Sequence, residues 1–385
     1  MRRVNGIISK ARWQQETAEA IVSTFQLADY GRSVSAGLLG RLILMAACVG
    51  TSLSGAAMRV RRSPSGETVR KALLASLPED VAVMEQRINR QLLLLTPKAF
   101  FRRPRRLAID LHQRPYYGQR ENVPVRGGKK KLGTKWFWTW ATIAVVEHGE
   151  RWTVAMTPVG PGDALEDIVT RLLDHLEKAK IPVEIALIDR EFYAAGVIAV
   201  LQSRGIPFLT PAIRRGQLQG PKGPTGTRRF FEPGTLGFFE HTWTARGKSK
   251  GQRVTVQIAC VLRRLSDRRR GPLVFAFWGI RPEDLPSYRE TYRRRFGIET
   301  SYRQLGEGLA QTTTKRIQWR MLLVAVALLL RNLWVWRNQH VHHVPVSLSL
   351  QLHQLIIYLS IELELILDFE IIKSQPSARQ PLTAL

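Results

Sequence analysis

The sequence has few cysteines, few acidic residues and no long hydrophobic run. Cys48 and Cys260 are the two cysteines in 385 residues, and both lie in apolar segments. This argues against a disulfide-stabilised fold and a cysteine-based zinc site. The longest apolar run, 321–330, lies between two arginines and is shorter than the ~20 residues of a membrane span. The first residues lack the apolar core of a signal peptide. We therefore expect a cytosolic protein with no membrane partner.

The shortage of acidic residues leaves a large excess of positive charge. There are 58 lysines and arginines against 31 acidic residues, which gives a net charge of +27. The hydrophobic share of 44% and the charged share of 23% are those of a globular protein. So much positive charge predicts a polyanionic partner such as nucleic acid. The basic clusters lie at 59–62, 102–106, 129–131, 263–270 and 293–295.

The first part of the chain, 1–98, reads as a separate all-α domain. Apolar residues recur at helical spacing between polar or Gly/Pro breaks. Ser65 follows the basic cluster 59–62 and is placed to cap the next helix. A small helical DNA-binding domain fits this pattern, and so does a helical scaffold with solvated arginines. The predicted helices cover 7–30, 36–53, 66–77 and 81–95.

From residue 99 onward strands and helices alternate, which predicts an α/β domain. Three strands, a helix, a strand, a second helix and a fifth strand follow one another in 99–212. By analogy this is the element order of an RNase H-like fold, a mixed five-stranded sheet with flanking helices. We assign 281–340, with its apolar helix, to the same domain. The predicted strands are 107–109, 136–146, 152–159, 183–188 and 206–209, and the helices are 163–180 and 192–203.

A basic, β-rich insertion interrupts this domain at 213–280. Between 211 and 280 there are 14 basic and three acidic residues, and short alternating stretches read as strands. A DNA-gripping subdomain and a long solvated hairpin both fit. The last segment, 341–385, is rich in leucine, isoleucine and acidic residues, and we expect a helical closure or a dimer contact there.

Three acidic residues are candidates for a metal site. Asp110 and Asp189 each follow an apolar stretch and are expected where buried strands end. Glu299 lies on a helix predicted over 287–315, and a surface ion pair is the alternative role for it. Converging carboxylates repel one another unless cations neutralise them, and Mg²⁺ prefers oxygen ligands. On that helix Glu299 shares one face with Tyr292, Arg295 and Arg303.

Three motifs together resemble the DDE transposases of prokaryotic insertion sequences, specifically the cut-and-paste group with a β insertion. They are IDLHQRPYYG at 109–118, LIDREFY at 187–193 and the Tyr-x2-Arg-x3-Glu element ending at Glu299. The resemblance covers roughly residues 100–340. It implies an RNase H-like domain in which Asp110, Asp189 and Glu299 hold Mg²⁺. Mn²⁺ is expected to be able to substitute for Mg²⁺.

The resemblance also implies a mechanism and partners. The family cuts double-stranded DNA at terminal inverted repeats, commonly through a hairpin, and joins the ends to target DNA. We expect a homodimer on DNA in a prokaryotic, nucleoid-associated setting. An insertion tryptophan stacks on a flipped base in similar transposases, which makes Trp278 a candidate and Trp243 a second one. The expected DNA-binding residues are Tyr292, Arg295, Arg303, Trp278, Arg190, Tyr117 and Lys315.

One departure from the family pattern bears on these assignments. The signature lysine seven positions after the glutamate is replaced by Gly306, so Arg303 or Lys315 would have to hold that phosphate. Tyr116 and Tyr117 could line the DNA strand near the scissile bond, or they could simply be packing residues of the protein. Two rival functions stay open: an RNase H-like DNA nuclease without transposition, and a non-catalytic DNA-binding descendant.

Overall fold

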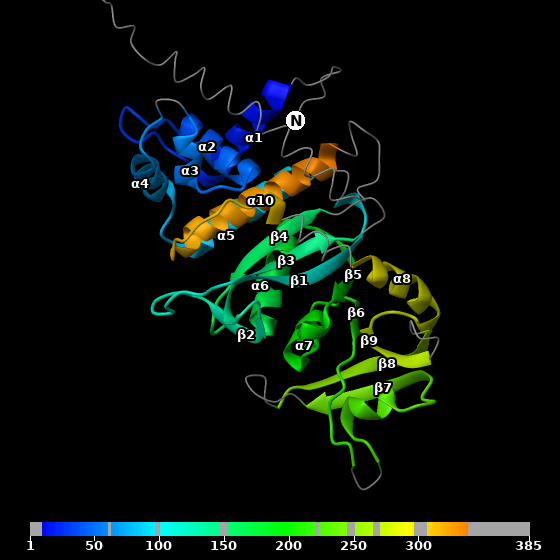
Figure 1. The fold of residues 1–385 in the computed structure, drawn as a ribbon. Coiled ribbons are helices and arrows are strands. Elements are labelled where there is room, and N and C mark those ends of the chain that lie inside the picture. Colours follow the sequence, from blue (N-terminus) through cyan, green and yellow to red (C-terminus); the bar gives the residue numbers. More distant parts are fainter. Residues whose placement is uncertain are drawn as a thin grey trace, which may run out of the picture. The chain divides into compact units, whose positions relative to one another are not determined.

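The computed structural model describes residues 10–60, 63–96, 101–146, 152–219, 223–244, 251–264, 270–295 and 306–337. The chain divides into two units (Figure 1). The first contains Met1–Gln91 and Ser301–Arg337, and the second contains Leu92–Thr300. The apolar helix near the end of the chain therefore groups with the N-terminal helices, whereas the sequence had suggested the sheet domain.

The first unit is helical, as expected. Ser35, Ser52 and Ser65 each accept a hydrogen bond from a backbone N–H three residues on, at 3.1, 3.0 and 3.2 Å, so each caps a helix. The helix expected over 36–53 ends at Val49, because Gly50 takes a left-handed φ of 66°, and a further short helix begins at Leu53. The helices are α1 (Lys10–Phe25), α2 (Ala36–Val49), α3 (Leu53–Met58), α4 (Gly66–Ser76), α5 (Val81–Leu94) and α10 (Ile317–Arg337).

Helix α10 forms much of the core of the first unit. It contacts α2, and the Gln318 side-chain amide donates a 2.6 Å hydrogen bond to the Glu79 carbonyl. By length and composition 317–336 could cross a membrane, but 89% of its most apolar stretch is buried inside the protein. Core helices of soluble proteins share this composition.

The second unit is built on one nine-stranded mixed sheet, with the strand order β2-β3-β1-β5-β6-β9-β8-β7 and β4 paired to β3. Strands β1, β5 and β6 are parallel, and the other pairs are antiparallel. The strands are β1 (Arg105–Pro115), β2 (Arg126–Lys131), β3 (Thr134–Val145), β4 (Thr153–Val159), β5 (Val183–Ile188), β6 (Phe208–Pro211), β7 (Gly237–Thr244), β8 (Arg253–Arg264) and β9 (Arg270–Trp278).

Two helices cover one face of this sheet. Helix α6 (Leu165–Lys178) packs on β3 and β4 and against α7 (Ala195–Ser203) (Figure 1). The buried side of α6 consists of isoleucine, valine and leucines at helical spacing. A third helix, α8 (Leu285–Arg295), follows β9 along the chain. The five strands expected from the sequence are all present and lie next to one another as β4-β3-β1-β5-β6.

The structure corrects two expectations about the strands. Strand β1 does not end before Asp110 but runs on to Pro115, because it keeps β3 as an antiparallel partner. The insertion is not a separate subdomain. Its last strand, β9, pairs with β6 from Phe208↔Trp278 to Pro211↔Phe275, so the insertion extends the main sheet.

The contact between α1 and α2 yields a stability prediction. A Cβ at Gly40 would lie 2.6 Å from Val22 Cγ2 and 3.0 Å from the Ala18 carbonyl oxygen. We expect Gly40→Ala to lower the free energy of unfolding by about 1–3 kcal/mol, since the helices must move apart. Chemical denaturation measures this change.

Gly37 provides the matched control on the same helix. A Cβ there meets nothing closer than the Arg41 guanidinium at 4.0 Å. Gly37→Ala should therefore raise the free energy of unfolding by about 0.5–1 kcal/mol through helix propensity. Equal effects of the two substitutions would contradict the close approach of α1 and α2.

Candidate active site

The parallel pairing of β1 with β5 brings two acidic residues together. The register aligns Ile109 with Ile188; Asp110 is the next residue on β1, and Asp189 is the residue directly after β5. Neighbouring strands lie about 4.8 Å apart, and residues in register point to the same face. The register therefore places these two acidic residues close together, as the sequence predicts. They lie at the carboxyl edge of β5, where open α/β sheets bind ligands.

Local hydrogen bonds fix the direction of both side chains. Asp110 Oδ1 accepts a 2.8 Å hydrogen bond from the backbone N–H of Leu111. Asp189 Oδ1 accepts a 2.7 Å bond from the N–H of Arg190, and it caps the short 3₁₀ helix Arg190–Phe192.

Two carboxylates on adjacent strands form an unfavourable pair unless a cation neutralises them. Both residues are partly exposed, so an ion could reach them. Oxygen donors of this kind suit Mg²⁺ or Mn²⁺. Within the part of the chain that the structure describes, no three His, Cys, Asp or Glu residues form a metal-binding group. The expected third ligand, Glu299, and Arg303 lie outside the described residues.

The other predicted DNA-binding residues have different surroundings. Tyr292 is 4% exposed, and its ring packs edge-to-face on Phe275 at 5.5 Å, so it is a packing residue in this structure. Arg295 is the last residue of α8. Lys315 is exposed and belongs to the first unit, in a segment without helix or strand. Gly306 is exposed, and the segment 341–385 lies outside the described residues.

Three predicted residues lie on the surface of the sheet unit. Arg190 is exposed directly beside Asp189. Tyr117 is 70% exposed, and its hydroxyl donates a 2.7 Å hydrogen bond to the Leu132 carbonyl. Trp278 ends β9 opposite Phe208 and is half-buried. Tyr116, by contrast, is buried, and its hydroxyl donates to the Gln119 carbonyl at 2.6 Å.

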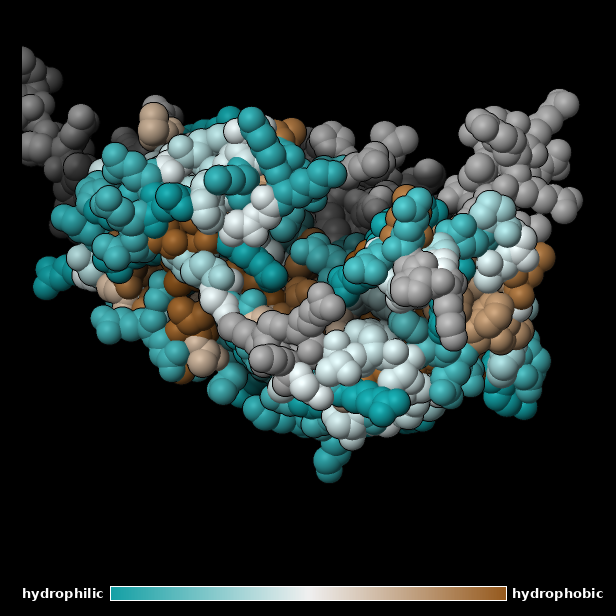
Figure 2. Space-filling model, turned by 90° about the horizontal axis from the view of Figure 1, so that it is seen from below, coloured by the Kyte–Doolittle hydropathy of each residue, from teal (hydrophilic) through white to brown (hydrophobic). Residues whose placement is uncertain are grey.

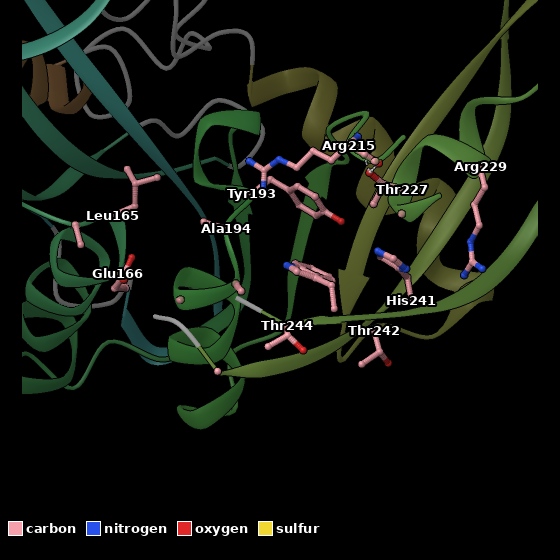
Figure 3. A pocket seen from close by; sticks show the side chains of 17 residues that line it. Leu165, Glu166, Tyr193, Ala194, Arg215, Thr227, Arg229, His241, Thr242 and Thr244 are labelled. Atoms are coloured by element: carbon pink, nitrogen blue, oxygen red, sulfur yellow. Dashed lines mark hydrogen bonds between the residues drawn. The ribbon is translucent and has the colours of Figure 1, made fainter. Parts of the chain in front are cut away.

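A cavity of about 1160 Å³ is lined in part by residues 193–196, which follow Asp189 closely in the sequence (Figure 3). The beginnings of α6 and α7 form one wall, and β7 and the segment around Arg215 and Thr227 form the others. Tyr193, Trp243 and His241 make a row of rings in it. Trp243 lies 5.4 Å from Tyr193 and 5.3 Å from His241, and it is nearly parallel to His241.

The cavity combines aromatic rings with positive charge. The Arg215 guanidinium lies 5.7 Å from the centre of the Tyr193 ring, and Arg229 also lines the cavity. The helix N-termini add partial positive charge, and Glu166 is the acidic lining residue. Burial, and secondarily Arg229, lowers the pKa of His241, so its ring is neutral near pH 7. Flat rings and cations together suit a nucleotide base with its phosphate.

Tyr193 contributes a buried polar group to this cavity. The residue is 1% exposed, and its hydroxyl oxygen is buried without a hydrogen-bond partner. Burial raises the pKa of the phenol well above its usual value. An unpartnered hydroxyl facing a cavity is available to a ligand. The ring is drawn inside the cavity in Figure 3.

Sequence reasoning named only part of this cavity. Trp243 was a candidate, and the alternation along β7 could have placed His241 on the same face. Tyr193 lies four residues after Asp189 within a motif that had been singled out. Arg215 and Arg229 had no such signal, because a loop brings in Arg215 and the short 3₁₀ helix Gly226–Phe231 brings in Arg229. On the face shown in Figure 2, hydrophilic residues predominate and hydrophobic residues form separate patches.

The fold and the site define a mixed α/β protein with a large mixed sheet, in which two carboxylates lie at the level where β5 ends. The whole chain aligns with 88% of a solved piggyBac transposase, at a TM-score of 0.51 and 12% identity. That structure is described as a synaptic complex with hairpin DNA. The two proteins therefore share a fold. No protein-family model and no curated protein matches the sequence.

The isolated hydroxyl of Tyr193 gives a testable prediction. We expect Tyr193→Phe to leave the free energy of unfolding unchanged or to raise it by up to about 1 kcal/mol, because no hydrogen bond is lost. Thermal or urea denaturation of the ligand-free protein measures the difference.

Thr227 is a suitable contrast in the same cavity, since its buried hydroxyl accepts a hydrogen bond from the Arg215 N–H at 2.9 Å. Thr227→Val should destabilise the protein by about 1–3 kcal/mol. A comparable loss in Tyr193→Phe would mean that the phenol hydroxyl is already satisfied.

Proposed function

We propose that the protein is a DNA transposase, which binds terminal inverted repeats and performs metal-dependent DNA cleavage and strand transfer. The observation that carries this proposal is that Asp110 and Asp189 directly follow Ile109 and Ile188, which are in register on the parallel strands β1 and β5. The fold shared with a piggyBac transposase supports the same reading. The net charge of +27 supplies the attraction for a polyanion.

The finer fold assignment is an RNase H-like domain. The central strands β4-β3-β1-β5-β6 have the sequence order 3-2-1-4-5, with the antiparallel strand second. In this proposal Glu299 completes the acidic set of a DDE site. Arg190 and Tyr117, both exposed on the sheet unit, are the proposed contacts to the DNA backbone. Arg295, Arg303 and Lys315 remain proposed phosphate contacts.

Mg²⁺ is the proposed cofactor, with Mn²⁺ as a substitute, and Asp110, Asp189 and Glu299 would hold it. Bound there, it would supply positive charge for the attacking and leaving oxygens of a phosphodiester. The carboxylates fit this part because they are adjacent and partly exposed. Water would attack first and release a 3′-hydroxyl, which then attacks the opposite strand or the target DNA.

Substitution of one aspartate tests the proposed chemistry. We expect Asp110→Asn to abolish cleavage in Mg²⁺ and to leave DNA binding nearly unchanged, because the amide cannot replace the anionic ligand. The substrate is duplex DNA carrying the inverted repeats that flank the coding sequence, and gel separation of the products measures nicks, hairpins and strand-transfer species.

Glu191→Gln is the matched control, since Glu191 is an exposed carboxylate only two residues after Asp189. It should retain cleavage. Cleavage by Asp110→Asn would contradict the assignment of Asp110 as a ligand of the catalytic metal. Cleavage by the unmodified protein without strand-transfer products would favour a nuclease, and DNA binding without any cleavage would favour a non-catalytic descendant.

The cavity around Trp243 is the proposed place for an unpaired nucleotide during hairpin formation. Base stacking on an aromatic ring contributes about 1–3 kcal/mol. We therefore expect Trp243→Ala to slow hairpin formation on a pre-nicked end by roughly five- to a hundredfold and to leave the first nick unchanged. Single-turnover kinetics on the two substrates separates these steps.

Phe238→Ala is the control for lost aromatic surface, because Phe238 lies on the same strand, is 53% exposed and does not line the cavity. It should behave as the unmodified protein does. An equal slowing of nicking and hairpin formation in Trp243→Ala would place the effect in general folding or DNA binding.

A further inference from the structure

The edge of the sheet carries a basic two-stranded ribbon that the proposed chemistry does not use. It consists of β2, the turn Leu132–Gly133 and the start of β3, that is, residues 126–136. Between 126 and 135 there are five basic and no acidic residues. Residues 127–133 and Lys135 are all exposed. The ribbon itself therefore contains no acidic side chain that could neutralise this positive charge.

The ribbon continues beyond the rest of the sheet. Strand β1 pairs with β3 as far as Pro115↔Phe137, and β2 pairs with β3 from Arg126↔Phe137 to Lys131↔Thr134. Past these residues the ribbon has no third strand among the described residues. Its five residues 127–131 span roughly 16 Å. It extends from the carboxyl end of β1, beyond Pro115.

Side chains at the base of the ribbon hold it rigid. The Trp136 indole packs under Gly127, at 3.2 Å from where a Cβ would lie, and carries the Arg120 guanidinium at 4.1 Å. The Thr134 hydroxyl donates to the Tyr116 carbonyl at 2.8 Å. The Tyr117 hydroxyl donates to the carbonyl of Leu132 in the turn. The ribbon is thus preorganised and is not a loose loop.

The residue at the tip is unusual. Leu132 and Gly133 have φ values of 49° and 81°, the pattern of a type I′ turn, whose first position favours asparagine or glycine. A leucine there is strained, and this one is also 76% exposed. Leucine is unfavourable here for two reasons, the left-handed backbone conformation and the exposure of its apolar side chain to solvent. A residue kept in such a position indicates a functional role for the tip.

We propose that this ribbon enters the major groove of duplex DNA, with Leu132 against the base edges. The inference rests on the proposed action on DNA and adds a docking element to it. A major groove about 12 Å wide and 8.5 Å deep admits a two-stranded ribbon, and thymine methyl groups offer apolar contact. Lys129 and Lys130, which project from an exposed edge, neutralise the flanking phosphates. Lysines on edge strands also discourage strand pairing between molecules, but that role does not require Leu132.

Removing two lysines tests the phosphate contacts. We expect the double variant Lys129→Gln/Lys130→Gln to reduce the slope of log affinity against log salt by about 1.8 on a mixed-sequence 30-bp duplex. Affinity at 0.1 M salt should fall roughly tenfold or more. Fluorescence anisotropy measures both quantities on the full chain.

Lys178→Gln/Lys180→Gln is the matched control. Both lysines are exposed at the end of α6, and the substitution removes the same charge. This variant should keep the slope within a few tenths of the unmodified value. Equal slopes for the two variants would show that charge alone matters and would overturn the ribbon assignment.

Substitution of the tip separates a role in binding from one in folding. Leu132→Asn places a favoured residue in the turn, so we expect Tm to rise by roughly 2 °C while DNA affinity falls several-fold. A binding loss without a stability loss assigns the tip to DNA. Unchanged affinity would overturn the contact of Leu132 with bases.

Competition identifies the groove. Methyl green, which occupies the major groove, should be displaced by the unmodified protein and much less by Leu132→Asn, while netropsin in the minor groove should not compete. Competition by netropsin alone would overturn the proposal. If Lys129→Gln/Lys130→Gln binds normally but Asp110→Asn loses cleavage, only the ribbon is wrong; if the unmodified protein does not bind DNA, the proposed function fails as well.

Discussion

The parallel contact between β1 and β5 is the constraint on which the site depends. Ile109 and Ile188 are fully buried and lie in register, so the core packing of two isoleucines fixes where Asp110 and Asp189 emerge. A slip of one residue would turn one carboxylate to the opposite face and expose its isoleucine. The free energy of burial therefore holds together two like charges that would separate in the unfolded chain.

Electrostatics links this pair to the rest of the molecule. A protein of net charge +27 keeps two acids adjacent at one edge, where Arg190 is an exposed neighbour. Such a protein attracts a polyanion over its whole surface, but only this edge among the described residues pairs two carboxylates on adjacent parallel strands. Broad attraction for polyanions and a local acidic pair are both consistent with the proposed action on DNA.

Periodicity predicted most of the fold, and side-chain contacts decided the rest. Apolar strands such as β5 were found within a residue, and Ser65 caps its helix as predicted. Strand β2 was missed because Arg-Gly-Gly-Lys-Lys-Lys has no alternation and is exposed on both faces. The adjacency of the two acids was predicted, whereas the burial of Tyr292 against Phe275 depends on a contact distant in sequence. Arg215 reaches the cavity from a loop and Arg229 from the short 3₁₀ helix Gly226–Phe231, and neither segment shows a periodic pattern in the sequence.

The pairing of β9 with β6 explains why the insertion can serve the same site. Strand β7 carries Trp243 and His241, β8 joins it to β9, and β9 is hydrogen-bonded to β6 beside β5. One continuous ladder therefore connects the wall of the cavity to Asp189, and Thr210 on β6 donates a hydrogen bond to the Asp189 carbonyl at 3.4 Å. Because a sheet deforms little along its hydrogen bonds, the distance between the rings and the carboxylates is set by the fold. A flexible tether would lose conformational entropy each time a ligand ordered it, whereas the ladder holds this arrangement beforehand.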